Sequence, residues 1–292
     1  MLSFEEILRL CRIMADLGIR KIKVTGGEPL VRRGAAAFLK NLKALPGIAR
    51  VTLTTNGFLL GAYLDEAETL SPGSLPDGVN VSLDAIDRER FMRMTRIPGL
   101  QPMEIFFHID RLLEKHVPVK INCVPVRGFN EQEIVPLAEL ARDRDIAVRF
   151  IELMPLGSAS RLEPVSGAEA AAIIEKACGG LTPYSGVDGN GPAVYYSLPG
   201  FKGKVGFINA VSRGFCETCN RLRLTSEGFL KPCLSADLDT DLRVLLRSNA
   251  SDSEISSTIT NTAAQKPRFH NFSGIYGAAA AQHSGGMFGI GG

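Results

Sequence analysis

Three cysteines near residue 220 carry the most specific chemical signal in the sequence. Two residues separate Cys216 from Cys219, and thirteen separate Cys219 from Cys233. A tight turn can present the first two thiolates and a following hairpin can return the third, a spacing typical of an iron or zinc site. The residues nearby are polar, namely Arg213, Glu217, Asn220 and Arg221. A chance group of core cysteines is therefore the weaker interpretation.

The number of cysteines does not decide between a zinc site and an iron–sulfur cluster. A structural zinc site needs a fourth soft ligand, and no fourth cysteine is spaced to supply it. Three thiolates suit an iron–sulfur cluster with one iron open to another ligand. Spacing alone favours neither metal centre over the other. The remaining cysteines, Cys11, Cys123 and Cys178, lie in apolar company and are expected to be core thiols.

Polar residues stand at the ends of several expected strands. Gly26 and Gly27 let a ligand approach the backbone, and Glu28 beside them either accepts hydrogen bonds from an ammonium group or caps a turn. Thr54 and Ser82 lie at the next two strand ends. Because parallel sheets collect binding sites at the carboxyl ends of their strands, these segments predict one shared site.

Two arginines after the cysteine turn predict an anion site. Residues two apart on a strand face the same side, so Arg221 and Arg223 can both fork onto a polyphosphate or carboxylate. Lys23 and Lys120 could add positive charge. A solvated strand face is the alternative. Met154, taken alone, is expected to be a packing residue rather than a ligand contact.

The elements that must position these residues follow a regular rhythm. The capping box formed by Ser3 and Glu6 predicts a helix at the start of the chain. Strands are expected at 20–24, 51–54, 79–83, 119–124 and 148–151, and amphipathic helical segments at 35–45, 103–115 and 131–143. A strand and helix every ~30 residues predicts an α/β fold with a parallel barrel or a doubly wound sheet.

Two domains are expected, 1–157 and 158–292, because the rhythm stops after residue 157. The second is expected to hold a helix near 167–177, glycine-rich turns near 185–191 and hairpin strands. Segment 248–262 predicts a surface segment or a weak helix. Since a β/α repeat usually opens on a strand, we expect the first strand and its loop to be missing.

Composition excludes several classes of protein. The chain has 292 residues, of which 45% are hydrophobic and 22% charged, as in globular proteins. A net charge of +2 gives no basic field for nucleic acid. No stretch has the ~18 apolar residues of a membrane helix, and no secretory signal opens the chain. We therefore expect a cytoplasmic protein without a disulfide framework.

These motifs together resemble the GTP 3′,8-cyclase family of radical S-adenosylmethionine (SAM) enzymes in molybdenum cofactor biosynthesis. The resemblance runs nearly from end to end, through LSFEEI, KIKVTGGEPL, TLTTNG, VNVSLDA, KINCVPVRGFN, RFIELMP, GPAVYY, GFINAVSRGFCETCNRLRLTSEGFLKPCL, KPRFH and MFGIGG. The cysteine set followed by Asn-Arg-Leu-Arg separates this family from the wider superfamily.

The resemblance implies an incomplete β/α (partial TIM-type) barrel lacking its first strand, with a C-terminal α+β iron-sulfur domain. In the family, an N-terminal 4Fe-4S cluster cleaves SAM reductively, and the resulting radical takes a hydrogen from the ribose of GTP. The product is (8S)-3′,8-cyclo-7,8-dihydroguanosine 5′-triphosphate, which cyclic pyranopterin monophosphate synthase is expected to consume. The resemblance also suggests a homodimer, and it leaves the electron donor unknown.

The resemblance assigns roles position by position and identifies no certain catalytic side chain. Three residues would bind SAM: Gly27, Ser82 and Met154. Five would bind GTP: Lys23, Thr54, Lys120, Arg221 and Arg223. The second 4Fe-4S cluster would be held by Cys216, Cys219 and Cys233. The terminal Gly291-Gly292 would reach into the active site.

Two departures from the family stand out. Lys23 replaces a common arginine, which keeps the charge but loses the bidentate fork. The family's N-terminal C-x3-C-x2-C triplet precedes LSFEEI, and no cysteine precedes Cys11 here. The expected explanation is a misplaced start or a fragment of a longer gene, and the 292-residue chain is expected not to cleave SAM. The missing strand would also leave the edge of 20–24 unpaired.

Two other classes of function remain as alternatives. The chain could be a GTP-binding protein that keeps only the C-terminal cluster and regulates or scaffolds a partner. It could also be a structural zinc protein with a vacant barrel.

Overall fold

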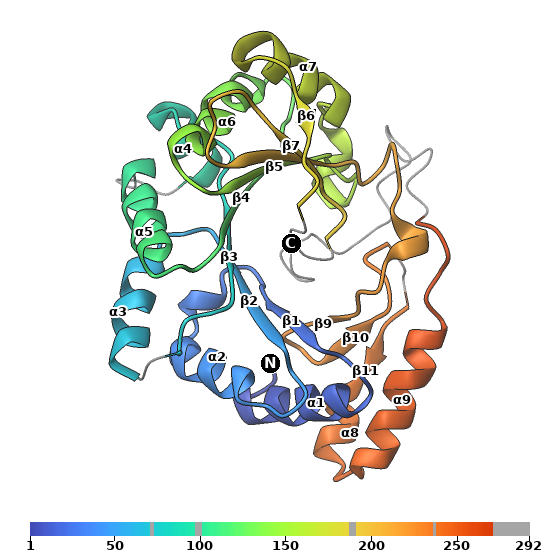
Figure 1. The fold of residues 1–292 in the computed structure, drawn as a ribbon. Helices are drawn as coiled ribbons and strands as arrows, with labels where there is room; N and C mark the ends of the chain where they lie inside the picture. The colour runs from blue at the N-terminus through green and yellow to red at the C-terminus, as the bar shows by residue number, and fades with distance from the viewer. Residues whose placement is uncertain (71–72, 97–100, 187–190, 236–237, 271–292) are drawn as a thin grey trace.

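A mostly parallel sheet of eight strands organises the fold (Figure 1). The computed structural model describes residues 1–70, 73–96, 101–186, 191–235 and 238–270. Along the sheet the strands are β1 (Lys21–Val24), β2 (Arg50–Thr55), β3 (Val79–Ser82), β4 (Val119–Cys123), β5 (Ala147–Ile151), β8 (Lys204–Ile208), β7 (Val194–Ser197) and β6 (Thr182–Pro183). The first six run parallel, and β7 and β6 are antiparallel additions.

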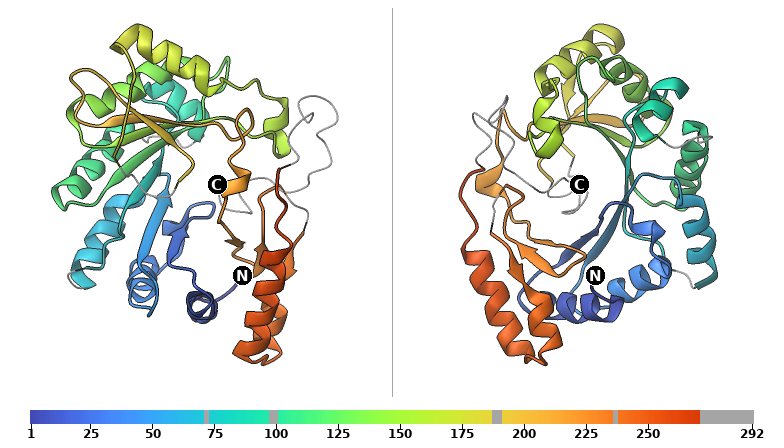
Figure 2. Two further views of the ribbon diagram at one scale, coloured as in Figure 1. Left: turned by 45° about the vertical axis from the view of Figure 1, so that its right-hand side comes forward. Right: turned by 180° about the vertical axis from the view of Figure 1, so that it is seen from behind.

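The helices that alternate with these strands lie on the outer side of the curved sheet (Figure 2). They are α1 (Phe4–Asp16), α2 (Ala35–Lys43), α3 (Leu60–Leu70), α4 (Arg88–Thr95), α5 (Pro102–Glu114), α6 (Ile134–Asp143) and α7 (Gly167–Cys178). Short 3-10 turns, η1 (Pro29–Val31), η2 (Glu131–Glu133) and η3 (Gly157–Arg161), complete the connections. The α/β prediction with a parallel sheet is confirmed.

Alternation along the strands gives the sheet two different faces. Leu53, Ile121 and Phe150 are buried in the core that the helices cover. Their neighbours in sequence point to the opposite, concave face, because side chains alternate along a strand. Most of those neighbours are polar or charged, for example Lys120 and Arg149. The sequence therefore places apolar residues outward and cations inward.

The sheet continues beyond residue 157, where the rhythm was expected to stop. Helix α7 crosses back over the sheet, and β8 pairs in parallel with β5. The hairpin of β6 and β7 lies between α7 and β8 in the sequence. It breaks the regular spacing of strands and helices, so this further strand-and-helix unit could not be recognised from periodicity. The division into domains at residue 157 stays a prediction.

A smaller sheet carries the C-terminal described residues. It contains β9 (Arg223–Leu224), β10 (Phe229–Lys231) and β11 (Thr240–Asp241), preceded by η4 (Cys216–Thr218) and followed by α8 (Leu242–Arg247) and α9 (Asp252–Ala264). Helix α9 falls in the segment expected to be a surface segment or weak helix. The Ser251 side chain and Glu254 form a capping box, the same signal that starts α1.

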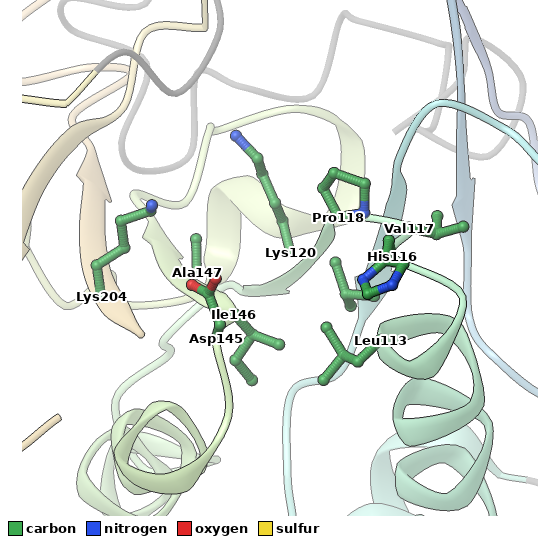
Figure 3. Close-up of a pocket in the computed structure, with 10 residues that line it drawn as sticks. Leu113, His116, Val117, Pro118, Lys120, Asp145, Ile146, Ala147 and Lys204 are labelled. Carbon is green, nitrogen blue, oxygen red and sulfur yellow. The ribbon is translucent and has the colours of Figure 1, made fainter. Parts of the chain in front are cut away.

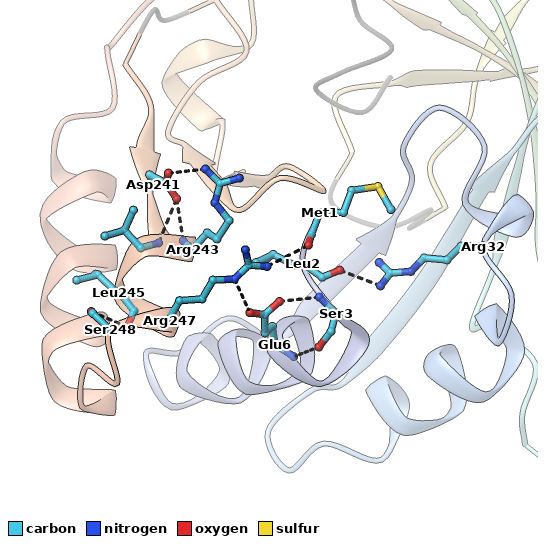
Figure 4. A network of polar contacts seen from close by, with 11 residues as sticks. Met1, Leu2, Ser3, Glu6, Arg32, Asp241, Arg243, Leu245, Arg247 and Ser248 are labelled. Carbon is cyan, nitrogen blue, oxygen red and sulfur yellow. Dashed lines mark hydrogen bonds and ion pairs between the residues drawn. The ribbon is translucent and has the colours of Figure 1, made fainter.

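A second apolar cluster joins this C-terminal unit to the start of the chain. Leu10 of α1 packs with Leu230, Leu242 and Ile255. Polar contacts reinforce it: Arg247 donates to the Met1 carbonyl and to Glu6, as Figure 4 shows. Helix α1 is therefore held by the C-terminal unit of the described residues.

At the end of the eight-stranded sheet, β1 has β2 as its only strand partner within the described part of the chain. No helix among the described residues is long and apolar enough to cross a membrane.

Candidate functional site

The loop after β1 is fastened to the end of β2 through Glu28. Its carboxylate accepts hydrogen bonds from the Thr55 hydroxyl (2.8 Å) and from the backbone N–H groups of Asn56 (2.7 Å) and Leu30 (3.0 Å). Glu28 thus caps η1, in agreement with the capping interpretation. Beside it, no atom lies within 4 Å of the point where a Cβ on Gly27 would stand. The Gly27 backbone is open to a ligand.

The loops after β3 and β4 are locked together by buried polar side chains. Fully buried Asn130 donates to the backbone carbonyl of Asp84 (2.9 Å) and accepts from the Val126 N–H (2.7 Å). Burial raises the pKa of Asp84 to about 6, although the Val124 N–H donates to its carboxylate and acts in the opposite direction. These contacts fix the rim on which the exposed Ser82 lies.

Buried Glu133 adds a second lock on the same rim. It accepts hydrogen bonds from the N–H groups of Ile86 (2.6 Å) and Asp87 (3.1 Å) and pairs with Arg90 at 2.7 Å. Sequence reasoning missed both Asn130 and Glu133. Asn130 lies in a loop and Glu133 at the end of η2, and the local sequence gives no signal for either, because what distinguishes both is burial.

Glu152 connects the ends of β5 and β8. The residue is buried, with 7% of its surface exposed. Its carboxylate accepts hydrogen bonds from the N–H groups of Val211 (2.8 Å) and Ser212 (2.9 Å) and from the Ser212 hydroxyl (3.2 Å). Half-buried Met154 lies two residues further along. Glu152 therefore positions the segment that leads to Cys216.

Positive charges gather along the concave face. Partial removal from water lowers the pKa of Lys23 to about 8, and repulsion by four cations adds to this shift. Those cations are Arg149, Arg221, Arg223 and Lys120. Burial is also the largest cause that lowers the pKa of Arg223, with Arg221 next. The structure therefore brings together the four basic residues expected to bind GTP.

Arg149 is the member of this group that sequence reasoning missed. It is buried and donates to the amide oxygens of Asn122 (2.8 Å) and Asn80 (2.6 Å). Asn80 in turn donates to the buried Thr54 hydroxyl at 3.3 Å. A chain of polar side chains thus crosses β2 to β5 and holds the Arg149 guanidinium in place.

The three cysteines lie around the β9–β10 hairpin, as their spacing predicted. Cys216 is the first residue of η4, Cys219 follows the turn directly, and Cys233 follows β10 by two residues. All three are half-buried. Among the described residues, no three His, Cys, Asp or Glu side chains are gathered closely enough to hold a metal ion. The assignment of these cysteines as cluster ligands stays a prediction.

The surroundings of Cys219 suit a thiolate. Burial acts to raise its pKa, but hydrogen bonds from Arg221 and the charges of Arg221 and Lys266 outweigh burial, so the pKa is lowered. Thiolates are the form in which cysteines bind iron and zinc. The surroundings of Cys219 therefore suit a ligand of a soft metal ion. The terminal Gly291-Gly292 lies outside the described residues.

Comparison with known proteins places both halves of the chain in known families. The Radical SAM superfamily model matches residues 1–141, and the Molybdenum Cofactor Synthesis C model matches residues 146–272.

Curated relatives match nearly the whole chain. A GTP 3′,8-cyclase of Clostridium perfringens (strain 13 / Type A) is 43% identical over 93% of this chain and 82% of its own length. One of Syntrophomonas wolfei is 41% identical over 94% of this chain and 84% of its own. Among solved structures, SuiB of Streptococcus suis bound to S-adenosylmethionine has a TM-score of 0.56 at 14% identity, covering 89% of this chain and 61% of SuiB. That likeness concerns the fold alone.

Proposed function

Because this chain belongs to the GTP 3′,8-cyclase family of the radical SAM superfamily, we propose that it carries the substrate site of the enzyme that converts GTP to (8S)-3′,8-cyclo-7,8-dihydroguanosine 5′-triphosphate. The conversion also needs a SAM-cleaving cluster, whose C-x3-C-x2-C ligands are not among these 292 residues. The observation that supports this most is the convergence of Lys23, Lys120, Arg221 and Arg223 on one concave face. Four cations suit a triphosphate, whose charges need several donors at once.

In this proposal the sheet is an incomplete parallel β/α barrel, followed by an α+β iron–sulfur domain. The six parallel strands support the barrel, and the β9–β10 hairpin with α8 and α9 supports the second unit. The phosphates of GTP lie against the cations of the concave face, and Thr54 contributes a hydroxyl. Arg149 aligns that face through Asn80 and Asn122.

SAM lies at the carboxyl ends of the strands in this proposal. The open backbone of Gly27 allows close approach, the exposed Ser82 supplies a hydroxyl, and Met154 supplies apolar contact. Glu28, Asn130 and Glu133 keep this rim rigid, since each fastens two loops to one another. A rigid rim holds the reacting groups in one geometry.

Cys216, Cys219 and Cys233 would hold a 4Fe-4S cluster beside the guanine. When bound, such a cluster supplies an open iron that can take a ligand atom from the base. The chain's own contribution is the cationic surroundings: Arg221 and Lys266 stabilise the thiolate of Cys219. The downstream synthase, the homodimer and the cytoplasmic location stay predictions.

Metal content and GTP binding test this proposal on the 292-residue polypeptide. Protein prepared without oxygen is expected to contain iron and acid-labile sulfide and to bind GTP. Arg223→Gln is expected to weaken GTP binding at least about tenfold, because one buried charge-assisted contact is lost. Arg12→Gln, an exposed arginine on α1, is the control and should leave binding unchanged. Zinc without GTP binding would instead support a structural zinc protein.

SAM cleavage is a separate question. The 292 residues contain no C-x3-C-x2-C triplet. This polypeptide is therefore expected to release no 5′-deoxyadenosine from SAM with a reductant, whereas a longer chain that carries the triplet is expected to do so. Release by the 292-residue polypeptide would contradict this expectation and would point to another set of cluster ligands.

A further inference from the structure

Two neighbouring tyrosines of β7 face opposite sides of the sheet. Tyr196 lies on the side that the helices cover, where its ring packs edge-on against the buried ring of Phe207, with 5.8 Å between the ring centres. Because side chains alternate along a strand, Tyr195 lies on the concave face. The register agrees, since Tyr195 pairs with Gly206, whose neighbours Val205 and Phe207 belong to the core. Tyr195 is therefore on the face that carries the cations.

Gly206 gives the Tyr195 ring room to lie across the sheet. A Cβ on Gly206 would stand 2.7 Å from Cδ1 and 2.8 Å from Cε1 of Tyr195, so the ring occupies the place of a side chain. Gly206 pairs in turn with Arg149 of β5. The ring thus leans from β7 over β8 toward the cations of the next strands, and a larger residue at position 206 would prevent this.

The Tyr195 hydroxyl reaches Lys120 on β4. The Lys120 ammonium donates to that hydroxyl at 3.2 Å, whereas it lies 5.2 Å from the centre of the ring. The hydroxyl is therefore the closer contact, and the ring adds only a distant cation–π attraction. The two residues are 75 positions apart, and β8 and β5 separate their strands in the sheet. The contact exists only because the ring crosses the sheet.

The other side of Lys120 borders open space. Lys120 lines a cavity of about 560 Å³ at the amino ends of β4, β5 and β8, and Figure 3 shows it there with Lys204. Its neighbour in register on β5 is Ala147, whose side chain ends at Cβ. A lysine side chain has many rotamers, so a partner is needed to select one of them. The Tyr195 hydroxyl is placed to do so.

We propose that Tyr195 is a positioning residue, which fixes the ammonium of Lys120 on the concave face. The proposal rests on the proposed function for the ligand that Lys120 meets, and it assigns Tyr195 no contact with that ligand. A hydrogen bond to the ammonium favours its charged form, against the repulsion between Lys120 and the nearby Lys23. It also fixes the charge before the ligand arrives, so that less conformational freedom is lost on binding.

Amine labelling tests the contact without a nucleotide. The 292-residue protein is treated briefly with acetic anhydride at neutral pH, and acetylation of Lys120 relative to the exposed Lys202 is read by mass spectrometry. Tyr195→Phe keeps the ring but removes the acceptor, which favours the neutral, reactive amine. The ratio is therefore expected to rise about three- to tenfold. Tyr196→Phe makes the same change on the opposite face and should leave the ratio unchanged. An unchanged ratio in Tyr195→Phe would overturn the proposal.

A double-mutant cycle tests the consequence for GTP. Tyr195→Phe should weaken equilibrium binding of GTP about fivefold, the effect of one net hydrogen bond, and should add nothing in the Lys120→Gln background. Tyr196→Phe should leave the affinity unchanged. Equal weakening in both backgrounds, as from a packing defect, or no weakening in either, would overturn the proposal. A wild-type protein that binds no GTP would contradict the proposed function instead, and the labelling ratio would still decide whether Tyr195 holds Lys120.

Discussion

At the scale of single residues, the site depends on keeping several cations close together. Close packing of cations disfavours the charged form of Lys23: burial and four neighbouring cations lower its pKa to about 8. An anion bound there would relieve the repulsion and favour the charged ammonium. This group of cations is therefore expected to favour an anion, and its affinity for GTP should depend on pH.

Replacing Lys23 by arginine should remove one part of that pH dependence. GTP favours the protonated Lys23, so wild-type affinity is expected to hold below pH 8 and to fall as pH rises through 8, by up to about tenfold. An arginine stays protonated over this range. The ratio of the wild-type and Lys23→Arg dissociation constants, measured from pH 7 to 9.5, should rise with pH. The titration of GTP itself cancels in this ratio, and a flat ratio would contradict the expectation.

The residues that sequence reasoning found and missed differ in a physical way. Lys23 and Arg223 were found because they alternate with apolar residues or stand beside a motif. Arg149 was missed, because its partners Asn122 and Asn80 lie 27 and 69 residues away in sequence. Glu152 was missed for the same reason, since its acceptor role depends on a loop 59 residues later. Pairings of this range exist only once the sheet has formed.

At the scale of elements, the five strands and the helices between them were predictable, but the docking of β8 was not. Strand β8 reaches β5 through a close approach at Gly203. A Cβ on Gly203 would lie 2.6 Å from the Arg144 carbonyl oxygen and would overlap the carbonyl oxygen of Ile146. Such an overlap with backbone cannot be relieved by a side-chain rotation. The periodicity of the sequence contains no information about this approach.

Gly203→Ala is therefore expected to destabilise the protein. Forcing an extra carbon into a packed site costs about 1–3 kcal/mol. Gly180→Ala is the matched control, because a Cβ there meets nothing within 4 Å. The free energies of unfolding by urea should differ between the two variants by at least about 1 kcal/mol. Equal stability of both would mean that β8 is not seated at this position.

At the scale of the whole molecule, the two ends of the described chain hold one another. Helix α9 packs on α1, and Arg9 of α1 contacts Asp252 and the Ala250 carbonyl. The apolar cluster beneath them is separate from the large core under the sheet. The helix start at Ser3 was predictable from its capping box, but its partner could not be predicted from local pattern.

Ile255→Ala tests whether this second cluster stabilises the whole molecule. Ile255 is fully buried between α9 and its neighbours, so its truncation is expected to cost about 2–5 kcal/mol. Ser257→Ala changes an exposed position on the same helix and should have little effect. Thermal unfolding followed by circular dichroism measures both. A loss confined to α9, with the melting of the sheet unchanged, would show that the C-terminal unit unfolds independently.

The pairing of α1 with α9 also determines when α1 can be buried during synthesis. Arg9 and Asp252 are separated by 243 residues. A ribosome that adds ~5–20 residues per second leaves α1 waiting roughly 12–50 s for its partner helix. During that interval Leu10, Ile13 and Met14, all buried in the finished protein, have no C-terminal unit to cover them. The newly made chain is therefore expected to expose this apolar face of α1 until α9 has left the ribosome.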